Sequence, residues 1–463
     1  MEPLSSPPRV PAARTANETG KGRFSPPNSS VPCGTAKKKG FPFARPVRYN
    51  GRRLELTDRR SNAMTTRQNA VWLYLGSEAR NAEEIAAFAE WCERNEVGKV
   101  LVHLSLSGRH PESAEQRVAA LAEACGSRGI EIHGMVSTLH QRVADRDELT
   151  LRDKSYYCVD AHGLSNYEEP ITGHGYVLDP RHPDVVRTVS AQCAELLRQF
   201  PGLSGIHLDF IRYYHYDSKL VIDTKSAGHW IGLPKAGQPI RLETADGVKT
   251  TFFVEQASNV YNDPPIGDKL VLSRTYRYCF CDDCLDGFER RYGVTLPDAA
   301  ADTAAKASWI LANRPAEWAE YRASIVTNLV GAIREAIRGV RPDASLSAAV
   351  WYNAPYGNEL RGEPMLPDSE YECFGQKWWE WVERGYVDFV CPMDYWMEPG
   401  SFAGVVEGQI RKAGGRVPVY AGLLRTPEYD VSRERYGEYA RRAEEAGANG
   451  LCFFHYGSWK QLL

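Results

Sequence analysis

The sequence lacks long hydrophobic runs. No stretch of its 463 residues approaches the roughly 18 consecutive apolar residues that mark a membrane-spanning helix. The N-terminus also has no apolar core of the kind that a secretion signal carries. The sequence therefore predicts neither a membrane span nor a secretion signal, and we expect a cytoplasmic protein.

An excess of either charge is missing as well. The chain has 56 Lys and Arg against 59 Asp and Glu, which leaves a formal net charge of -3. This balance gives no electrostatic reason to expect binding to nucleic acid or to an anionic membrane. The balance favours a neutral or small ligand instead, and it leaves the oligomeric state open. The 11 Trp and 24 Tyr would suit stacking on sugar faces, but most of them are expected to be ordinary core and surface aromatics.

Paired cysteines at regular spacing are absent too, so a disulfide framework is not predicted. Eleven cysteines are scattered singly, except for Cys279, Cys281 and Cys284 in "YCFCDDC". This C-x-C-x-x-C spacing is typical of a structural zinc site, for which Cys158 in another loop is the candidate fourth ligand. The alternative is that these thiols only pack beneath the following helix, "DGFERRYG". No H-E-x-x-H motif is present, so we expect catalysis to require no cofactor.

The first 68 residues have no apolar periodicity and are rich in Pro, Ser, Gly, Lys and Arg. Such a segment cannot bury enough apolar surface to offset its ordering entropy, which predicts a disordered extension over residues 1–68. The "SNAM" before residue 65 resembles an expression-tag junction, which raises the question whether residues 1–63 are native. We expect one catalytic domain over residues 69–463, with an inserted β-patterned loop at about 214–300.

Eight apolar runs alternate with amphipathic helical stretches from residue 71 onward. The predicted strands cover 71–76, 99–105, 130–137, 205–213, 345–352, 388–395, 417–423 and 450–457. Eight strand-then-helix units predict an α/β fold, a (β/α)8 TIM barrel with long loop insertions on its C-terminal face. An open doubly wound sheet is the alternative, but "YLGSEARN" after the first strand lacks the G-x-G-x-x-G that it would need.

Carboxylates stand at the ends of the fourth and sixth predicted strands. In "GIHLDFIRY" the alternation of side chains separates Ile206 and Leu208 from His207 and Asp209. We expect Asp209 at the mouth of the barrel and Asp394, from "DFVCPMDYW", pointing into the same mouth. Paired carboxylates there predict glycoside hydrolysis, with Asp209 held ionised by its basic neighbours and Asp394 in the drier surroundings of an acid.

Further side chains are predicted to line a polar and aromatic cup that suits a hydroxyl-rich ligand. These candidate substrate-binding residues are His103, His133, His207, Arg212, Tyr213, Trp351, Asn353, Tyr395 and His455. Alternatives remain open. Asp209 and Arg212 can instead form a structural ion pair while Asp394 caps a turn, and the second carboxylate can come from the loops after the fifth and seventh strands, at Glu359, Glu363, Glu372 or Glu428.

The segments "GIHLDFIRY", "WVERGYVDFVCPMDYW" and "GANGLCFFHYGS" resemble the family-10-like group of glycosyl hydrolase-like TIM barrels. The resemblance implies a carbohydrate-active hydrolase with Asp209 and Asp394 at the matching strand ends. The cysteine spacing is similar to the zinc site of some barrel β-galactosidases. This chain departs from the largest clan of barrel glycosidases, which has glutamates at the ends of strands four and seven. The corresponding ends here have Asp209 and "YAGLLRT". An aspartate pair on strands four and six is similar instead to α-galactosidase-type barrels, which favours a retaining mechanism.

The leading hypothesis is an O-glycoside hydrolase that acts on an oligo- or polysaccharide. The alternative, from another class, is a non-catalytic carbohydrate-binding TIM barrel. A barrel lyase or aldolase is disfavoured, because no lysine stands at a strand end to form a Schiff base.

Overall fold

The computed structural model describes the chain from residue 69 to the C-terminus, with gaps. The described ranges are 69–106, 112–141, 151–171, 175–223, 235–243, 249–257, 269–297, 302–352, 369–427 and 429–463. The predicted N-terminal extension lies outside them.

Eight parallel strands form one sheet in the order β12-β11-β6-β3-β2-β1-β14-β13. The strands are β1 Asn69–Leu73, β2 Val97–Leu104, β3 Glu131–Ser137, β6 Gly205–Asp209, β11 Ser345–Val350, β12 Phe389–Pro392, β13 Tyr420–Leu424 and β14 Gly450–Phe454. A parallel bridge between Val390 and Val419 joins the two outer strands, β12 and β13. All eight predicted strands and the (β/α)8 barrel are therefore confirmed.

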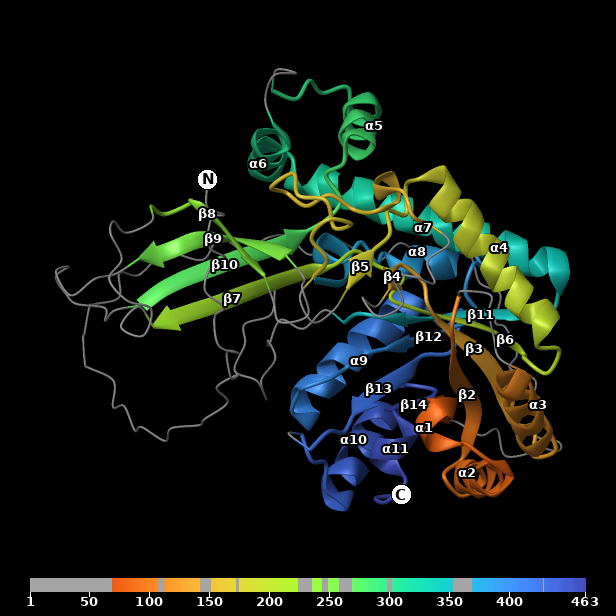
Figure 1. Cartoon of the computed structure of the whole chain (residues 1–463). Helices are drawn as coiled ribbons and strands as arrows, with labels where there is room; N and C mark the ends of the chain where they lie inside the picture. The colour runs from red at the N-terminus through yellow and green to blue at the C-terminus, as the bar shows by residue number, and fades with distance from the viewer. Residues whose placement is uncertain are drawn as a thin grey trace, which may run out of the picture. The chain divides into compact units, whose positions relative to one another are not determined.

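Helices surround the barrel strands (Figure 1). The α-helices of the described residues are α1 Leu75–Glu78, α2 Ala82–Arg94, α3 Glu112–Gly126, α4 Pro183–Gln199, α5 Asp282–Tyr292, α6 Thr303–Asn313, α7 Pro315–Val340, α8 Trp378–Glu383, α9 Pro399–Ala413, α10 Arg433–Glu445 and α11 Tyr456–Trp459. Glycines in the left-handed conformation, Gly293 and Gly414, end α5 and α9. This is the ordinary helix stop that the sequence pattern predicts.

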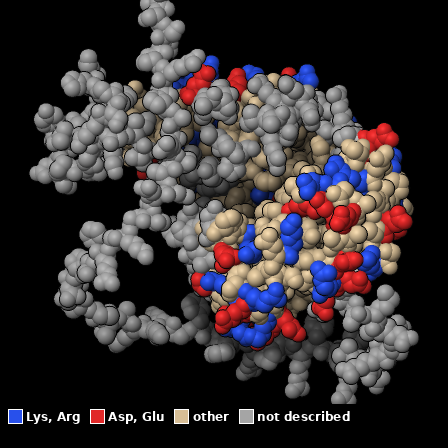
Figure 2. Space-filling view, turned by 60° about the horizontal axis from the view of Figure 1, so that its bottom comes forward, with Lys and Arg blue, Asp and Glu red and all other residues tan. Residues whose placement is uncertain are grey.

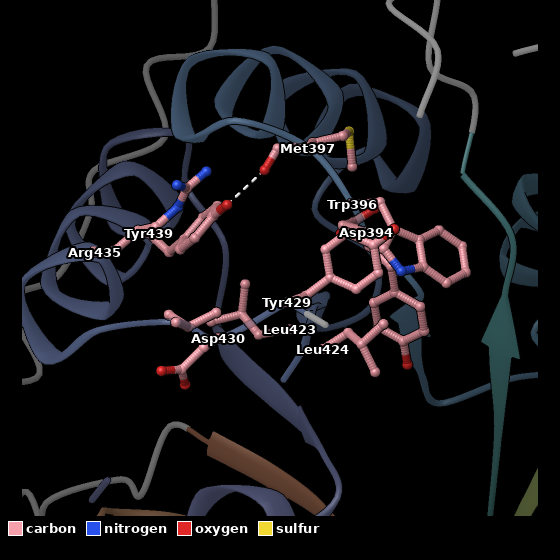
Figure 3. A pocket seen from close by; sticks show the side chains of 11 residues that line it. Asp394, Trp396, Met397, Leu423, Leu424, Tyr429, Asp430, Arg435 and Tyr439 are labelled. Carbon is pink, nitrogen blue, oxygen red and sulfur yellow. Dashed lines mark hydrogen bonds between the residues drawn. The ribbon is translucent and has the colours of Figure 1, made fainter. Parts of the chain in front are cut away.

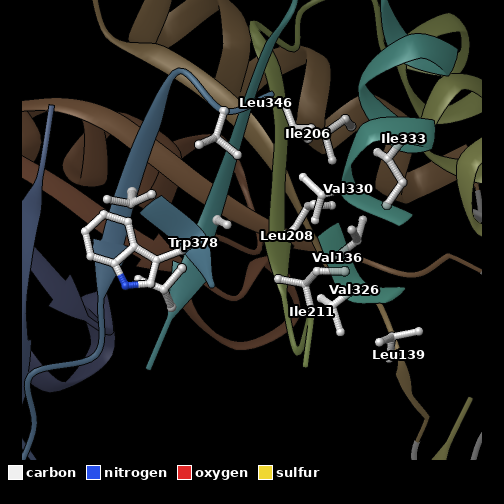
Figure 4. Close-up of a cluster of buried hydrophobic side chains, with 14 of the residues drawn as sticks. Val136, Leu139, Ile206, Leu208, Ile211, Val326, Val330, Ile333, Leu346 and Trp378 are labelled. Carbon is white, nitrogen blue, oxygen red and sulfur yellow. The ribbon is translucent and has the colours of Figure 1, made fainter. Parts of the chain in front are cut away.

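The barrel has two hydrophobic cores, one between the strands and the helices and one in the lumen. In the outer core, Ile206 and Leu208 of β6 pack with Val326 and Val330 of α7 (Figure 4). The lumen is filled by a second cluster that includes Trp72, Leu101, Met135, Phe389 and Cys391. The barrel is therefore solid, and any ligand has to bind at its mouth.

An antiparallel sheet is inserted after β6, in the order β7-β10-β9-β8. Its strands are β7 His215–Asp223, β8 Pro239–Glu243, β9 Lys249–Ala257 and β10 Lys269–Arg277. From β10, the fully buried Arg274 binds both Asp160, at 2.9 Å, and Glu169 in the loop that also contains the short strand pair β4 His140–Gln141 and β5 Tyr176–Val177. A buried cation shared by two carboxylates anchors the inserted sheet to this loop.

The charge distribution agrees with the composition. On the face shown in Figure 2, Lys and Arg are interspersed with Asp and Glu, and neither sign forms a field of its own. Within the described residues, no helix combines the length and the apolar character that crossing a membrane requires.

Candidate active site at the mouth of the barrel

Asp209 is the last residue of β6 and lies at the mouth of the barrel. Its Oδ1 accepts a hydrogen bond from the Phe210 amide at 2.7 Å and lies 3.6 Å from Arg212 Nη1. The side chain keeps 13% of its surface exposed. Burial raises the pKa of Asp209, and the charge of Arg212 and the amide bond oppose this rise. On balance the pKa of Asp209 is raised, although by less than burial alone would raise it, and part of the side chain stays exposed.

Arg212 is held in place by two aromatic rings. Its guanidinium carbon lies 4.5 Å from the ring centre of Phe210 and 5.6 Å from that of Trp351, which follows β11. Stacking of this kind holds the planar cation beside Asp209, with which it forms an ion pair at 3.6 Å. The mouth beside Asp209 thus combines a carboxylate, a guanidinium and an indole.

Asp394 lies just beyond β12 and is almost fully buried, with 3% of its surface exposed. Gln409 of α9 donates a hydrogen bond to its Oδ1 at 2.6 Å, while Oδ2 has no hydrogen-bond partner among the described residues. Burial raises the pKa of Asp394 to about 7, although Gln409 and the Gly422 backbone lower it. Near neutral pH this carboxyl group is accordingly half protonated.

The orientation of Asp394 differs from the prediction. Phe389, Cys391 and Met393 face the lumen, whereas Val390 faces the helices. Asp394 shares the side of Val390 and reaches α9 rather than the centre of the barrel. The physical reason is that the lumen is itself an apolar core, so both faces of β12 are hydrophobic and the alternation alone does not separate them.

Asp394 lines a cavity of about 230 Å³ between the ends of β12 and β13 and the helix α10 (Figure 3). Its wall includes Trp396, Leu424, Tyr429 and Arg435. The volume is below the roughly 300–1,000 Å³ that is usual for drug-sized ligands. The cavity therefore suits one small unit held between aromatic rings and a buried acid.

Tyr395 connects this cavity with the lumen. It lines the cavity, and its ring also packs in the lumen 6.5 Å from Trp72. Burial raises the pKa of its hydroxyl well above the usual value, and the negative charges of both Asp209 and Asp394 contribute to that rise. Both carboxylates are therefore close enough for their charges to act on this hydroxyl.

Two other predicted cup residues lie at the rim of the barrel. His103 of β2 is half-buried, with its ring 5.5 Å from that of Tyr74, and its charge acts on Asp209. His455, directly after β14, keeps 31% of its side chain exposed. His103 and Arg212 thus act on Asp209 and Trp351 contacts Arg212, whereas His455 is connected with His103 through the ring of Tyr74.

Three predicted cup residues lie deeper. His133, near the start of β3, is fully buried and binds Glu131 at 3.1 Å. His207 is fully buried against Ser347, at 2.9 Å, and burial lowers its pKa to about 3, so that it is neutral. Tyr213 is fully buried beneath the guanidinium of Arg322. None of the three has exposed surface for a ligand. The sequence pattern predicts which side of a strand a residue faces but not how deeply it is buried, so this part of the predicted cup is wrong.

Most of the alternative carboxylates lie outside the described residues: Glu359, Glu363 and Glu428. The predicted substrate-binding residue Asn353 also lies outside them. Glu372 is exposed, and its backbone oxygen accepts a hydrogen bond from Arg322. The sequence reasoning missed Glu78, a buried carboxylate at the rim in α1. Its signal was present, because "YLGSEARN" directly follows the first strand, where active-site residues of barrels stand.

The cysteine cluster contains a carboxylate that was not predicted. Cys279, Cys281, Cys284 and Asp179 have ligand atoms that all lie within 4.8 Å of one another. Cys281 Sγ is 3.1 Å from Asp179 Oδ2, and burial raises the pKa of Asp179. Cys158 is not one of the four, although its thiol contacts that of Cys279. Three thiols and one carboxylate match the number and chemistry of donors in a closed tetrahedral zinc site.

Comparison with known proteins supports the fold and the family resemblance. Residues 284–429 match the family model described as Glycosyl hydrolase-like 10. No curated protein matches the chain.

Among solved structures, the PgaB (BpsB) glycoside hydrolase domain from Bordetella bronchiseptica matches with a TM-score of 0.50 and 11% identity, over 84% of this chain and 93% of that one. A GH42 β-galactosidase from G. stearothermophilus matches with a TM-score of 0.50 and 8% identity, over 84% of this chain but only 51% of the β-galactosidase. The predicted resemblance to the glycosyl hydrolase-like group is thus confirmed over the matched segment, and the chain has the fold of glycoside hydrolase TIM barrels.

Proposed function

We propose that this protein hydrolyses O-glycosidic bonds of an oligo- or polysaccharide, with Asp394 as the acid and Asp209 as the ionised carboxylate. The observation that carries the proposal is the difference between their surroundings. Asp394 is dry, with a pKa of about 7, whereas Asp209 has a cation and an amide beside it. Unequal environments for two carboxyl groups are what glycoside hydrolysis requires.

The role of each carboxyl group in proton transfer follows from these surroundings. Protonated Asp394 donates its proton to the glycosidic oxygen as the bond to the anomeric carbon breaks. The carboxylate of Asp209 either attacks the anomeric carbon or takes a proton from the attacking water, which are the retaining and inverting forms of the reaction. Trp396 and Tyr429 line the cavity beside Asp394 and offer ring faces for a sugar unit.

The test is release of new reducing ends by the full chain on a panel of oligo- and polysaccharides. Asp209→Asn and Asp394→Asn are compared with the wild type, and Asp343→Asn is the matched control, since Asp343 is exposed before the start of β11, at the opposite end of the strand from the mouth. We expect activity in the wild type and the control and its loss in both site variants. Full activity in either site variant would remove that residue from the proposal.

The second candidate function is carbohydrate binding without catalysis. It is favoured by one observation: Asp394 is directed towards Gln409 of α9 rather than towards the lumen. In that case the glycan panel shows binding to the wild type, by isothermal titration calorimetry, with no release of reducing ends by any form of the protein.

A structural zinc ion at Cys279, Cys281, Cys284 and Asp179 is a separate proposal. When bound, it joins the loop before α4 to the start of α5 and has no part in the hydrolysis. Elemental analysis of the purified protein is expected to find about one zinc per chain, and Cys284→Ser to lose it. Cys193→Ser is the control, because Cys193 is a buried thiol in α4 outside the cluster. Wild-type protein that binds no zinc contradicts this proposal.

A further inference from the structure

Glu78 is a buried carboxylate at the barrel rim that the proposed reaction does not use. Only 4% of its side chain is exposed. Its Oε2 accepts a hydrogen bond from the Tyr74 amide at 2.9 Å, and its Oε1 accepts one from the Gly457 amide at 2.8 Å. It also binds His455 Nδ1. One side chain thus joins the end of β1 to the turn after β14, across 377 positions of the sequence.

The backbone is shaped around this carboxylate. A Cβ atom placed on Gly457 would collide with Glu78 Oε1, so only glycine lets the amide approach so closely. A buried carboxylate with two amide donors is held in one orientation, which leaves its bond to the imidazole as the variable contact. Because Glu78 is fixed by these two amides, its contact with His455 can determine which nitrogen of that ring carries the proton.

The contact with Glu78 determines which nitrogen of the neutral His455 ring carries the proton. An ionised carboxylate only accepts hydrogen bonds, so Nδ1 has to be the donor. Nε2 is then unprotonated and is an acceptor. Its only hydrogen-bond partner among the described residues is Ser458 Oγ at 3.4 Å, which is a weak contact.

His455 also lies where a ligand can reach it. Its side chain is 31% exposed, and its ring centre lies 5.3 Å from that of Tyr74. Tyr74 in turn contacts His103, whose charge acts on Asp209. The strands β14, β1 and β2 are neighbours, so the rings of His455, Tyr74 and His103 follow one another along the rim of the barrel toward Asp209.

We infer that Glu78 is a positioning residue that holds His455 in the Nδ1–H tautomer, so that Nε2 accepts a hydrogen bond from a sugar hydroxyl at the mouth. The identity of the ligand rests on the proposed function, whereas the tautomer does not. This role differs from that of Asp209 and Asp394, because neither Glu78 nor His455 exchanges a proton with the glycosidic bond.

Nuclear magnetic resonance tests the tautomer without any substrate. The full chain is labelled with ¹⁵N-histidine, and His455→Asn identifies the signals of His455 in long-range ¹H–¹⁵N spectra. We expect the wild-type ring to show a protonated Nδ1 and an unprotonated Nε2, and Glu78→Gln to populate the other tautomer. Glu83→Gln, an exposed glutamate of α2, is the matched control and leaves the spectrum unchanged. A protonated Nε2 in the wild type overturns the inference.

Kinetics test the contact with the sugar. The substrates are tetrasaccharides of glucose, galactose, mannose and xylose, and the one that the wild type hydrolyses fastest is used. Asparagine keeps a donor near the place of Nδ1 but has no counterpart of Nε2, so His455→Asn is expected to raise KM by roughly 3- to 10-fold, the loss of one hydrogen bond, with little change in kcat. An unchanged KM overturns the contact. If no tetrasaccharide is hydrolysed, the proposed function fails, and the spectrum still decides the tautomer.

Discussion

The two carboxylates of the candidate site follow β6 and β12, which are separated in the barrel only by β11. Asp209 keeps 13% of its side chain exposed and has Arg212 beside it, whereas Asp394 is 3% exposed with an amide of Gln409 as its side-chain partner. Burial raises the pKa of both, but only Asp209 has a cation that opposes the rise. The same residue type thus acquires two chemical characters from its neighbours alone.

The comparison also shows how a solid barrel can provide a dry acid. The lumen is filled by Trp72, Phe389 and other apolar side chains, so neither carboxylate lies in a water-filled channel. Asp394 becomes dry by pointing outward beneath α9, while Asp209 stays at the open mouth. The pKa of the Tyr395 hydroxyl is raised by both charges in addition to burial. Four experiments test this contrast between Asp209 and Asp394.

The largest effect is expected from Asp209→Asn. Removal of the ionised carboxylate, with the rest of the mouth unchanged, is expected to lower kcat/KM by about 10³-fold on the glycan identified by the panel. The measurement is reducing-end release under pseudo-first-order conditions, with Asp343→Asn as the control. Activity within tenfold of the wild type would mean that Asp209 has no chemical role.

The second effect concerns stability. The pKa of Asp394 is about 7 in the folded protein against an ordinary value of 3.8. Below about pH 4 both states hold the proton, and between pH 4 and 7 only the folded state keeps it, so rising pH destabilises the fold. At about 1.4 kcal/mol per pKa unit, the wild type loses about 4 kcal/mol relative to Asp394→Asn across this range.

Urea unfolding of wild type and Asp394→Asn at pH 4, 5.5 and 7.5 measures this difference. The variant cannot titrate at this position, so subtracting its free energy of unfolding from that of the wild type isolates the carboxyl group. A difference that does not change with pH would mean that Asp394 is ionised in the folded protein, which would break the contrast with Asp209.

The third effect is catalytic. Asp394→Asn is expected to lower kcat/KM by about 10²-fold, because the amide cannot donate a proton to the leaving oxygen. In the wild type, kcat/KM is expected to fall as the pH rises through about 7, since Asp394 loses its proton there. The pH–rate profile of the variant then lacks this alkaline limb. A limb that persists in the variant belongs to another group.

The smallest effect is expected from Arg212→Met. This change removes the charge that lowers the pKa of Asp209, so the acidic limb of the pH–rate profile moves to higher pH. We expect the loss of kcat/KM to be largest at acidic pH, about tenfold for a shift of one pKa unit, with partial recovery as the pH rises. Arg187→Met, at a largely exposed arginine of α4, is the control and leaves the profile in place. An unshifted acidic limb would show that Arg212 serves the fold rather than Asp209.

Much of the fold could be predicted from local patterns. Runs such as "KVLVHLS" and "GLCFFHYG" are mostly apolar because their strands are buried on both faces, and this feature is visible without any tertiary contact. The placement of Asp209 at the end of its strand follows from the same reasoning. The alternation within β6 was right because only one of its faces is wholly apolar.

The parts of the site that could not be predicted depend on neighbours far away in the sequence. The direction of Asp394 depends on Gln409 and on a lumen that is already filled. Asp179, not the predicted Cys158, completes the set of four donors with Cys281, which lies 102 positions away. Glu78 matters only because the chain brings it to His455.

By itself, the sequence determined the barrel, the order of its strands and the carboxylate that ends β6, because periodicity and strand ends are local properties of a chain. Which carboxyl group is dry, which nitrogen of His455 contacts Glu78 and which groups can share a metal ion follow only from the folded chain. Burial and hydrogen bonding set pKa values and tautomers, and both depend on residues that meet only after the barrel has closed.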